Sequence, residues 1–274
     1  DRIELDLLNQ QDVQNFFKNH KIDQVYLAAA KVGGINANNT YPADFIYENL
    51  TIETNIIHNA FLNGVNKLLF LGSSCIYPKY AKQPIKEEEL LTGKLEPTNE
   101  PYAIAKIAGI KMCESYSKNY NLDFKSLMPT NLYGPNDNYD LSNSHFFPAL
   151  LKKIHTAKKE NNKNLLIWGS GKAKRELMFV DDFADAVIFF MKKKIKEPFL
   201  NIGTGKDYSI RWYANFIMKE LKIKLKIISD KTKPDGTPKK CLDISLAKTY
   251  GWKPNNNFKK ALKITYNNFL NKIS

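Results

Sequence analysis

A tyrosine and a lysine lie four residues apart in this chain, in a segment whose pattern predicts a helix from Glu100 to about Asn119. Residues at this spacing project from the same face of a helix, so Tyr102 and Lys106 are expected to be neighbours. A free phenol ionises near pH ~10, and a nearby ammonium favours the phenolate and lowers that pKa. The pair is therefore able to exchange a proton with a carbonyl or alcohol group near neutral pH.

Ser73-Ser74-Cys75 follows the apolar segment 67–72, which predicts a buried strand that ends at this point. A hydroxyl at the end of a strand can hold the same oxygen as the tyrosine, and a thiol two residues further on adds a second acid or base. The two groups of residues together predict a site for proton transfer.

Strands and helices alternate along the first part of the chain. The patterns predict the end of a strand at 5–8, strands at 22–29, 67–72, 124–128 and 199–202, and helices at 12–19, 43–63 and 100–119. Such alternation is typical of a parallel, doubly wound sheet. Ligands of these sheets bind beyond the carboxyl ends of the strands, where Ala29-Ala30, Ser73-Ser74-Cys75 and Pro129-Thr130-Asn131 are expected to meet.

After Gly134-Pro135 the pattern changes to shorter elements. It predicts helices at 145–160 and 210–221, a helix capped by Asp181-Asp182, strands at 165–168, 177–180 and 225–228, and a final helix. We therefore expect a Rossmann-like doubly wound sheet with a smaller C-terminal α/β substrate domain. The predicted cofactor domain is 1–135 plus about 175–203, and the predicted substrate domain is about 136–174 plus 204–274.

A strand, a G-x-G-x-x-G turn and a helix open a dinucleotide-binding sheet, and no such element precedes Asp1. One β-α-β unit takes about 30 residues or more. The expectation is an N-terminally truncated chain that lacks this first unit.

The net charge of +13 raises the possibility of a nucleic-acid partner, but only three of the 41 basic residues are arginines. Proteins that bind the phosphates and bases of nucleic acids favour arginine, because its guanidinium can donate two parallel hydrogen bonds. We therefore expect no nucleic-acid partner. No apolar run approaches the roughly 18 residues that span a bilayer, and no membrane is expected. Three cysteines without C-x-x-C spacing favour neither a disulfide framework nor a zinc site, and a reducing cytoplasm fits them. No bound metal is predicted.

Several longer motifs carry a resemblance to a known family. They are GSSCIYP at 72–78, EPTNEPYAIAK at 96–106, MPTNLYGP at 128–135, SNSH at 142–145, WGSG at 168–171 and KPDGTPKK at 233–240. With the block at 25–50, they make the chain resemble the extended short-chain dehydrogenase/reductases, and within them the GDP-L-fucose synthases, over essentially its whole length.

The resemblance implies epimerisation at C3 and C5 of GDP-4-keto-6-deoxy-D-mannose, followed by NADPH-dependent reduction at C4 to GDP-L-fucose. It assigns the epimerisation to Cys75 and His145. It assigns proton donation in the reduction to Tyr102, supported by Lys106 and Ser73.

The resemblance also implies binding residues. Those for NADP(H) are Ala28, Ala30, Leu71, Gly72, Ser73, Ser74, Tyr102, Lys106, Pro129, Thr130, Asn131, Leu132 and His145. Those for the GDP part of the substrate are Lys153, Trp168, Arg175, Asp235 and Lys240. In this family the helices at 43–63 and 100–119 pair across a two-fold axis, so a homodimer is expected.

Two alternatives remain open at this point. Another extended reductase, such as a sugar-nucleotide 4-epimerase with tightly held NAD, would keep Tyr102 and Lys106 without needing Cys75 and His145. A truncated chain could also be an inactive fragment. The residues present do not distinguish NADP from NAD, because that choice rests on residues after the second strand of the complete sheet.

Overall fold

A parallel sheet forms the centre of the molecule in the computed structural model, which describes residues 2–141, 144–232, 237–255 and 257–273. Its strands are β1 (Val25–Leu27), β2 (Lys67–Leu71), β3 (Asp123–Pro129) and β7 (Phe199–Ile202), in the order β1-β2-β3-β7. All three neighbouring pairs are parallel. The expected α/β fold with a parallel sheet covered by helices is confirmed.

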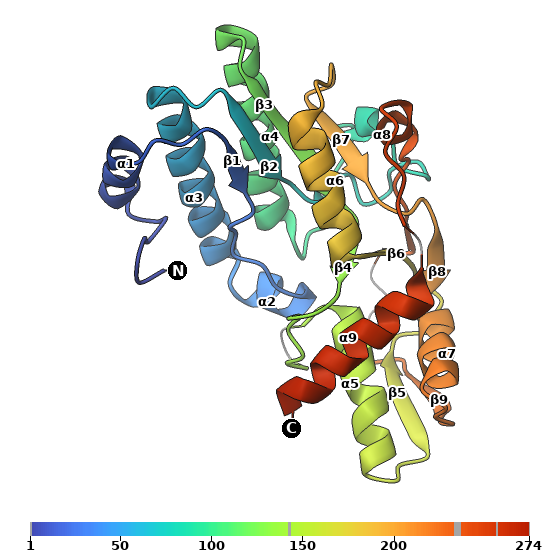
Figure 1. Cartoon of the computed structure of the whole chain (residues 1–274). Coiled ribbons are helices and arrows are strands. Elements are labelled where there is room, and N and C mark those ends of the chain that lie inside the picture. Colours follow the sequence, from blue (N-terminus) through green and yellow to red (C-terminus); the bar gives the residue numbers. More distant parts are fainter. Residues whose placement is uncertain (1, 142–143, 233–236, 256, 274) are drawn as a thin grey trace.

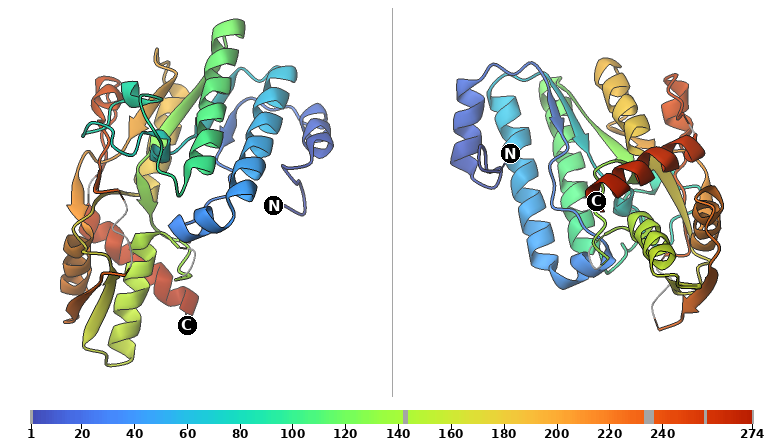
Figure 2. Two further views of the ribbon diagram at one scale, coloured as in Figure 1. Left: turned by 180° about the vertical axis from the view of Figure 1, so that it is seen from behind. Right: turned by 60° about the horizontal axis from the view of Figure 1, so that its bottom comes forward.

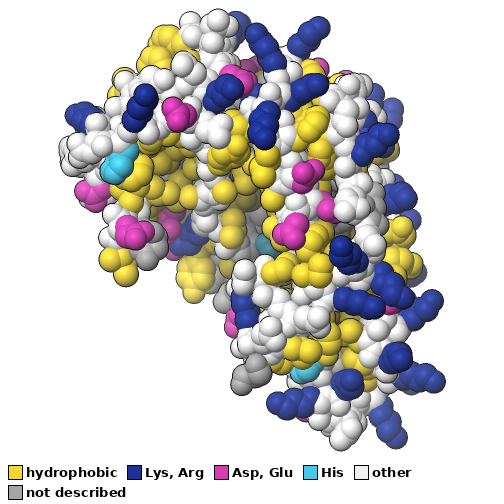
Figure 3. Space-filling view, viewed as in Figure 1, with side chains coloured by type: hydrophobic (Ala, Val, Ile, Leu, Met, Phe, Trp, Pro, Cys, Tyr) yellow, Lys and Arg dark blue, Asp and Glu magenta, His cyan; other side chains and the backbone are white. Residues whose placement is uncertain are grey.

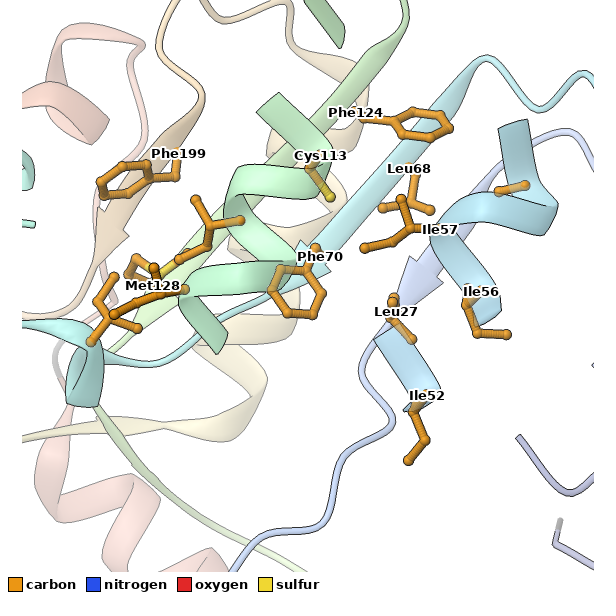
Figure 4. Close-up of a cluster of buried hydrophobic side chains, with 14 of the residues drawn as sticks. Leu27, Ile52, Ile56, Ile57, Leu68, Phe70, Cys113, Phe124, Met128 and Phe199 are labelled. Carbon is orange, nitrogen blue, oxygen red and sulfur yellow. The ribbon is translucent and has the colours of Figure 1, made fainter. Parts of the chain in front are cut away.

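Helices cover both faces of this sheet (Figures 1 and 2). On one face lie α1 (Gln10–Asn19), α3 (Pro42–Leu62) and α4 (Glu100–Tyr120), and on the other lie α6 (Val180–Lys192) and α8 (Ser245–Thr249). Alternate residues of a strand point to opposite faces. Leu68 and Phe70 of β2 accordingly pack with α3 and α4 (Figure 4), while Leu69 packs with α6.

The C-terminal half builds a second core. Its strands are β4 (Asn131–Tyr133), β5 (Asn164–Trp168), β6 (Lys174–Phe179), β8 (Asp207–Ser209), β9 (Lys226–Asp230) and β10 (Lys239–Lys240). The helices α5 (Phe146–Lys159), α7 (Ile210–Glu220) and α9 (Phe258–Ile273) pack around them. Short elements complete the fold: α2 (Ile35–Thr40), η1 (Ser74–Ile76) and η2 (Glu87–Glu89).

The two halves enclose a hollow that the space-filling view displays between the sheet with α3 and the part formed by α5 and α9 (Figure 3). The chain crosses between the halves more than once, since α8 follows β10 in sequence yet packs with α6 on the first sheet. The exact division into two domains stays a prediction.

Two local predictions were wrong. Residues 5–8 are not a strand; the Asp6 carboxylate accepts a bond from the Leu8 N–H (3.1 Å) and forms a turn instead. The Asp181-Asp182 pair lies inside the first turn of α6 rather than capping it, because β6 runs directly into the helix and Phe179 becomes the N-cap residue. The two carboxylates still interact favourably with the positive, N-terminal end of the helix dipole.

A buried carboxylate joins the two halves. The Glu176 side chain on β6 is completely buried and accepts bonds from the backbone N–H groups of Thr204, Gly205 (2.7 Å) and Leu242 (2.7 Å). These three N–H groups belong to the loop after β7 and to the segment after β10. A Cβ at Gly203 would lie 2.2 Å from a Glu176 oxygen, so only glycine leaves room for the carboxylate.

Replacing this carboxylate should destabilise the whole chain. In Glu176→Gln one acceptor oxygen becomes a donor that faces buried N–H groups, and we expect a loss of about 2–4 kcal/mol in the free energy of unfolding. Urea denaturation followed by circular dichroism measures this. The control is Glu160→Gln, at an exposed position after α5, and equal stabilities of the two variants would contradict the role given to Glu176.

Candidate active site

The end of β2 positions a hydroxyl and a thiol. After Leu71 the chain turns into η1, and the Ser73 Oγ caps that turn by accepting a bond from the Cys75 N–H at 3.2 Å. Ser73 and Cys75 are half-buried, whereas Ser74 is buried. The cap fixes Ser73 and Cys75 side by side at the carboxyl end of the sheet.

The first turn of α4 brings Tyr102 to the same place. The helix begins with Pro101 in its first turn, where a missing N–H costs nothing. The Tyr102 hydroxyl lies near the Ser73 side chain and the Cys75 thiol, and both influence its pKa. Three of the five predicted catalytic residues are thus neighbours.

Lys106 shares the helix face of Tyr102, as expected, but it has a partner that the sequence did not suggest. Its Nζ is 2.9 Å from an oxygen of Glu53 on α3, and both side chains are buried. The ammonium also lies 4.5 Å from the Phe70 ring centroid and 5.9 Å from that of Tyr102.

The expectation that Lys106 lowers the pKa of Tyr102 was wrong. Burial, the neighbouring Cys75 and the Glu53 carboxylate raise the pKa of Tyr102, and the Ser73 hydroxyl opposes them. The Lys106 ammonium is paired with Glu53 rather than with the phenol. Tyr102 is therefore a protonated acid at neutral pH.

Cys75 has the opposite electrostatic environment. The Lys240 ammonium lies 3.4 Å from the Cys75 sulfur. Burial alone would raise the pKa of Cys75, but Lys240, the Ser73 hydroxyl and Arg175 outweigh it, and the pKa is lowered. A thiol with a lowered pKa supplies the thiolate, which is the basic and nucleophilic form. Lys240, which the resemblance gave to the GDP part, thus lies against the thiol.

His145 precedes α5 and completes this group of titratable residues. Partial loss of hydration and the Lys240 ammonium lower the pKa of His145. The same lysine therefore influences both Cys75 and His145, and the imidazole is mainly neutral at neutral pH. His145 is the last residue of the SNSH motif at 142–145, and Ser142 and Asn143 of that motif lie outside the described residues.

Two cations lie side by side on neighbouring strands. Lys240 of β10 is in register with Arg175 of β6, and the Arg175 guanidinium donates to the carbonyls of Lys174 (2.8 Å) and Thr237 (2.6 Å). Such a pair can hold an anion such as a pyrophosphate. The predicted Asp235 lies outside the described residues.

The other two predicted substrate residues form a separate pair. Trp168, at the end of β5, is 49% exposed, so it is no core residue. The Lys153 ammonium lies 5.5 Å from its ring centroid. A flat exposed ring beside a cation is suited to stacking with a base.

The predicted cofactor residues divide into an outward and an inward group. Ala28, Ala30, Leu71, Pro129, Asn131 and Leu132 are exposed or half-buried, whereas Gly72, Ser74 and Thr130 are buried. A Cβ at Gly72 would come within 2.4 Å of the Met128 sulfur, which gives this glycine a packing role. The side chains of Thr130 and Asn131 donate to the Glu176 carbonyl at 3.2 and 3.1 Å.

Sequence reasoning missed two functional candidates, Glu53 and Asn49. The Asn49 amide donates to the Lys31 carbonyl (3.0 Å) and accepts from its N–H (2.9 Å), which fixes the loop that follows Ala28 and Ala30. Both residues lie on the buried face of α3 among isoleucines. Polar residues on an apolar helix face were the signal that could have found them.

Comparisons with known proteins agree with this geometry. The model of the NAD dependent epimerase/dehydratase family matches residues 1–203. The GDP-L-fucose synthase of Escherichia coli (strain K12) is 55% identical over 98% of this chain and 87% of its own length.

Solved structures are similar as well. A GDP-6-OMe-4-keto-L-xylo-heptose reductase from C. jejuni superposes with a TM-score of 0.92 at 38% identity, over 99% of this chain and 89% of its own. A GDP-L-fucose synthetase from Naegleria fowleri bound to NADP has a TM-score of 0.88 at 25% identity, over 100% of this chain and 85% of its own. The chain belongs to the NAD dependent epimerase/dehydratase family, among the extended short-chain dehydrogenase/reductases.

Proposed function

We propose that this chain catalyses the NADPH-dependent 3,5-epimerisation and 4-reduction of GDP-4-keto-6-deoxy-D-mannose to GDP-L-fucose. The observation that carries the proposal is a single group of neighbouring side chains. Ser73 accepts from the Cys75 N–H, the Cys75 sulfur contacts Lys240, and the Tyr102 hydroxyl lies near both Ser73 and Cys75. A protonated phenol and an activated thiol share one site, and the two-stage reaction needs both. The likeness to the E. coli GDP-L-fucose synthase supports the substrate.

The residues present fit a nicotinamide cofactor. Ala28, Leu71 and Leu132 remain partly exposed at the carboxyl ends of the strands. Small and apolar side chains leave room for a flat ring and offer it an apolar surface. The proposed NADP(H) site is formed by these residues with Ala30, Pro129 and Asn131. When bound, NADPH supplies the hydride for C4, and the protein supplies position and protons.

For epimerisation we assign the first proton transfer to Cys75. The 4-keto group acidifies the protons on C3 and C5, and the thiolate favoured by Lys240 removes them. His145 returns a proton from the opposite side of the ring. Because the pKa of His145 is lowered, its protonated form is scarce at neutral pH, so the rate should rise as the pH falls, until the thiolate is protonated.

For reduction we assign proton donation to Tyr102. The raised pKa keeps its O–H intact, and Ser73 orients that group toward the substrate oxygen. The carbonyl oxygen at C4 would take the Tyr102 proton and become the new hydroxyl. A well-placed general acid of this kind contributes about 10²–10⁴ in rate.

The GDP part of the substrate is assigned to the remaining cations and to Trp168. Arg175 and Lys240 form the proposed contact with the pyrophosphate. Lys153 and Trp168 form the proposed contact with the guanine base. Asp235 stays a proposal from the family resemblance alone.

A sugar-nucleotide 4-epimerase with tightly held NAD is the second candidate. It would use Tyr102 in the same way but would have no need for a thiol with a lowered pKa. The Lys240 contact to Cys75 favours the first candidate. Identification of the nucleotide released on denaturation, together with NADPH oxidation in the presence of the keto sugar, separates the two.

The thiolate assigned to Cys75 must remain reduced to act as a base, and the described cysteines are free thiols. We therefore propose the cytoplasm as the compartment. No helix among the described residues combines the length and apolar character needed to cross a membrane.

A homodimer through α3 and α4 is also proposed. The two helices pack side by side on one face of the sheet. They carry exposed apolar side chains, namely Tyr47 and Leu62 on α3 and Ile104 and Tyr120 on α4. A surface shared by two neighbouring helices suits a second copy of the same surface across a two-fold axis.

Replacing the thiol should separate the two stages of the reaction. In Cys75→Ser the hydroxyl is a far weaker base, so exchange of the C3 and C5 protons with deuterium oxide should fall by about 10²-fold or more. Hydride transfer to a substrate that is already epimerised should change less than tenfold. Proton NMR measures the exchange and NADPH absorbance the hydride transfer; equal losses of both would contradict the assignment.

Removing the neighbouring ammonium should make Cys75 less acidic. In Lys240→Gln the thiol loses the main group that lowers its pKa, so alkylation by iodoacetamide should reach its half-maximal rate at a higher pH than in the parent. Mass spectrometry of the labelled peptides assigns the signal. Cys113 and Cys241 act as internal controls, because burial raises the pKa of each to about 12. An unchanged pH profile would show that Lys240 does not activate the thiol.

A charge one turn from Ile104 on α4 should weaken the proposed dimer. Ala108 lies one turn after Ile104 and is half-buried, and Ala108→Arg should shift the mass measured by light scattering toward the monomer. The matched control is Ala184→Arg, at an exposed position of α6 on the other face of the sheet. A parent protein that is monomeric at high concentration would refute the dimer.

A further inference from the structure

Trp168 and Asp230 end two neighbouring strands at the same level. β5 and β9 are parallel, and Trp168 pairs in register with Asp230. The Gly169 N–H donates to the Asp230 carbonyl at 2.9 Å, which ties the two strand ends together. Residues in register on neighbouring parallel strands project to the same face of a sheet. The indole ring and the carboxylate therefore lie on one face.

This face of the two-stranded sheet points outward. Leu165 and Ile167 of β5 are buried in the C-terminal core, whereas Leu166 and Trp168 of the same strand are exposed. Ile228 of β9 is also exposed and pairs in register with Leu166. The two strands therefore present an apolar surface that ends in a tryptophan and a carboxylate.

A lysine from α5 reaches the same corner. The Lys153 Nζ lies 5.5 Å from the Trp168 ring centroid and donates to the Leu166 carbonyl at 3.4 Å. Burial lowers the pKa of Lys153, and the Asp230 carboxylate opposes this effect, so the two charges lie within range of each other. An aromatic ring, an ammonium and a carboxylate thus form one cluster.

The turn after β9 holds the Asp230 carboxylate in a fixed orientation. Its Oδ1 accepts from the Thr232 N–H at 3.0 Å and from the Thr232 hydroxyl at 2.6 Å. A carboxylate has about four lone-pair sites, so it can accept further bonds beside these two. A group that is already oriented loses little freedom when it binds a ligand.

The three groups of this cluster match guanine best among the common bases. Guanine carries two neighbouring donors, N1–H and the 2-amino group, beside the O6 acceptor. A carboxylate accepts from the donors, an ammonium donates to O6, and the indole ring stacks on the base. Adenine would instead turn an N1 lone pair toward the carboxylate, and uracil offers it only one donor.

The cluster is joined to the proposed pyrophosphate contact through both strands. β5 is followed by β6, which carries Arg175, and β9 is followed by β10, which carries Lys240. Arg175 and Lys240 are in register, as Trp168 and Asp230 are. The base contact and the pyrophosphate contact thus lie on consecutive strand pairs, which suits one nucleotide that extends from the first pair to the second.

We propose that Asp230 selects guanine in the GDP part of the substrate: its carboxylate accepts from N1–H and the 2-amino group, while Lys153 donates to O6 and Trp168 stacks on the ring. The presence of GDP in the substrate rests on the proposed function. Neither the motifs nor the family resemblance pointed to Asp230, because it precedes the KPDGTPKK block.

The experiment is titration calorimetry of the full chain with GDP, inosine diphosphate and ADP. Inosine diphosphate is GDP without the 2-amino group. For the parent we expect GDP to bind about tenfold more tightly than inosine diphosphate and about 100-fold more tightly than ADP, because each loses part of a paired contact with the base.

In Asp230→Asn an amide NH₂ replaces one acceptor and faces the guanine donors. GDP should bind about 10–100-fold more weakly, its advantage over inosine diphosphate should disappear, and the affinity for ADP should change by about twofold or less. The matched control is Asp185→Asn, at an exposed position of α6. It makes the same change in net charge and should keep both selectivity ratios.

Three results would overturn the proposal. An equal loss for all three nucleotides in Asp230→Asn would mean that Asp230 only supports the turn with Thr232. An unchanged ratio of GDP to inosine diphosphate would assign the selection to another group. A parent that binds the three nucleotides equally would also decide against Asp230, and this measurement does not need the variant to fold.

The proposed function is tested separately, by NADPH oxidation with GDP-4-keto-6-deoxy-D-mannose. The nucleotide titrations need neither cofactor nor turnover. A parent that selects GDP through Asp230 but does not oxidise NADPH with this sugar would refute the proposed function and leave the role of Asp230 intact.

Discussion

The Glu176 carboxylate is the interaction on which the arrangement of the site depends. Its three backbone donors, Thr204, Gly205 and Leu242, lie in two segments that are far apart in sequence. It fixes the loop after β7 and the segment after β10 against β6. The cations that face the site, Arg175 on β6 and Lys240 on β10, are placed by the same attachment.

Electrostatics moves the pKa values of two neighbouring groups in the proposed site in opposite directions. Cys75 and Tyr102 are both removed from water, which by itself raises the pKa of each. Lys240 outweighs this rise for Cys75, so the pKa of the thiol is lowered. The Glu53 carboxylate adds to the rise for Tyr102. Two groups whose pKa values are moved apart in this way can act as base and acid in one pocket.

Much of this was predictable from local sequence. The apolar runs of β2 and β3 and the long patterns of α3 and α4 predicted their elements nearly to the residue, because burial repeats along a strand or helix with a fixed period. The Tyr102–Lys106 spacing predicted a shared helix face. The failures were local. A turn held by the Asp6 carboxylate replaces the strand predicted at 5–8, and a direct junction between β6 and α6 leaves Phe179, not Asp181 or Asp182, at the cap position.

The sequence by itself determined the fold class, the edge of the sheet at which the site lies, and the residue types that carry the chemistry. The tertiary structure alone decided their ionisation. Glu53 pairs with Lys106 across 53 positions of sequence, and Lys240 meets Cys75 across 165. A pKa depends on burial and on charges within a few ångströms, and neither is encoded in the spacing of residues along the chain.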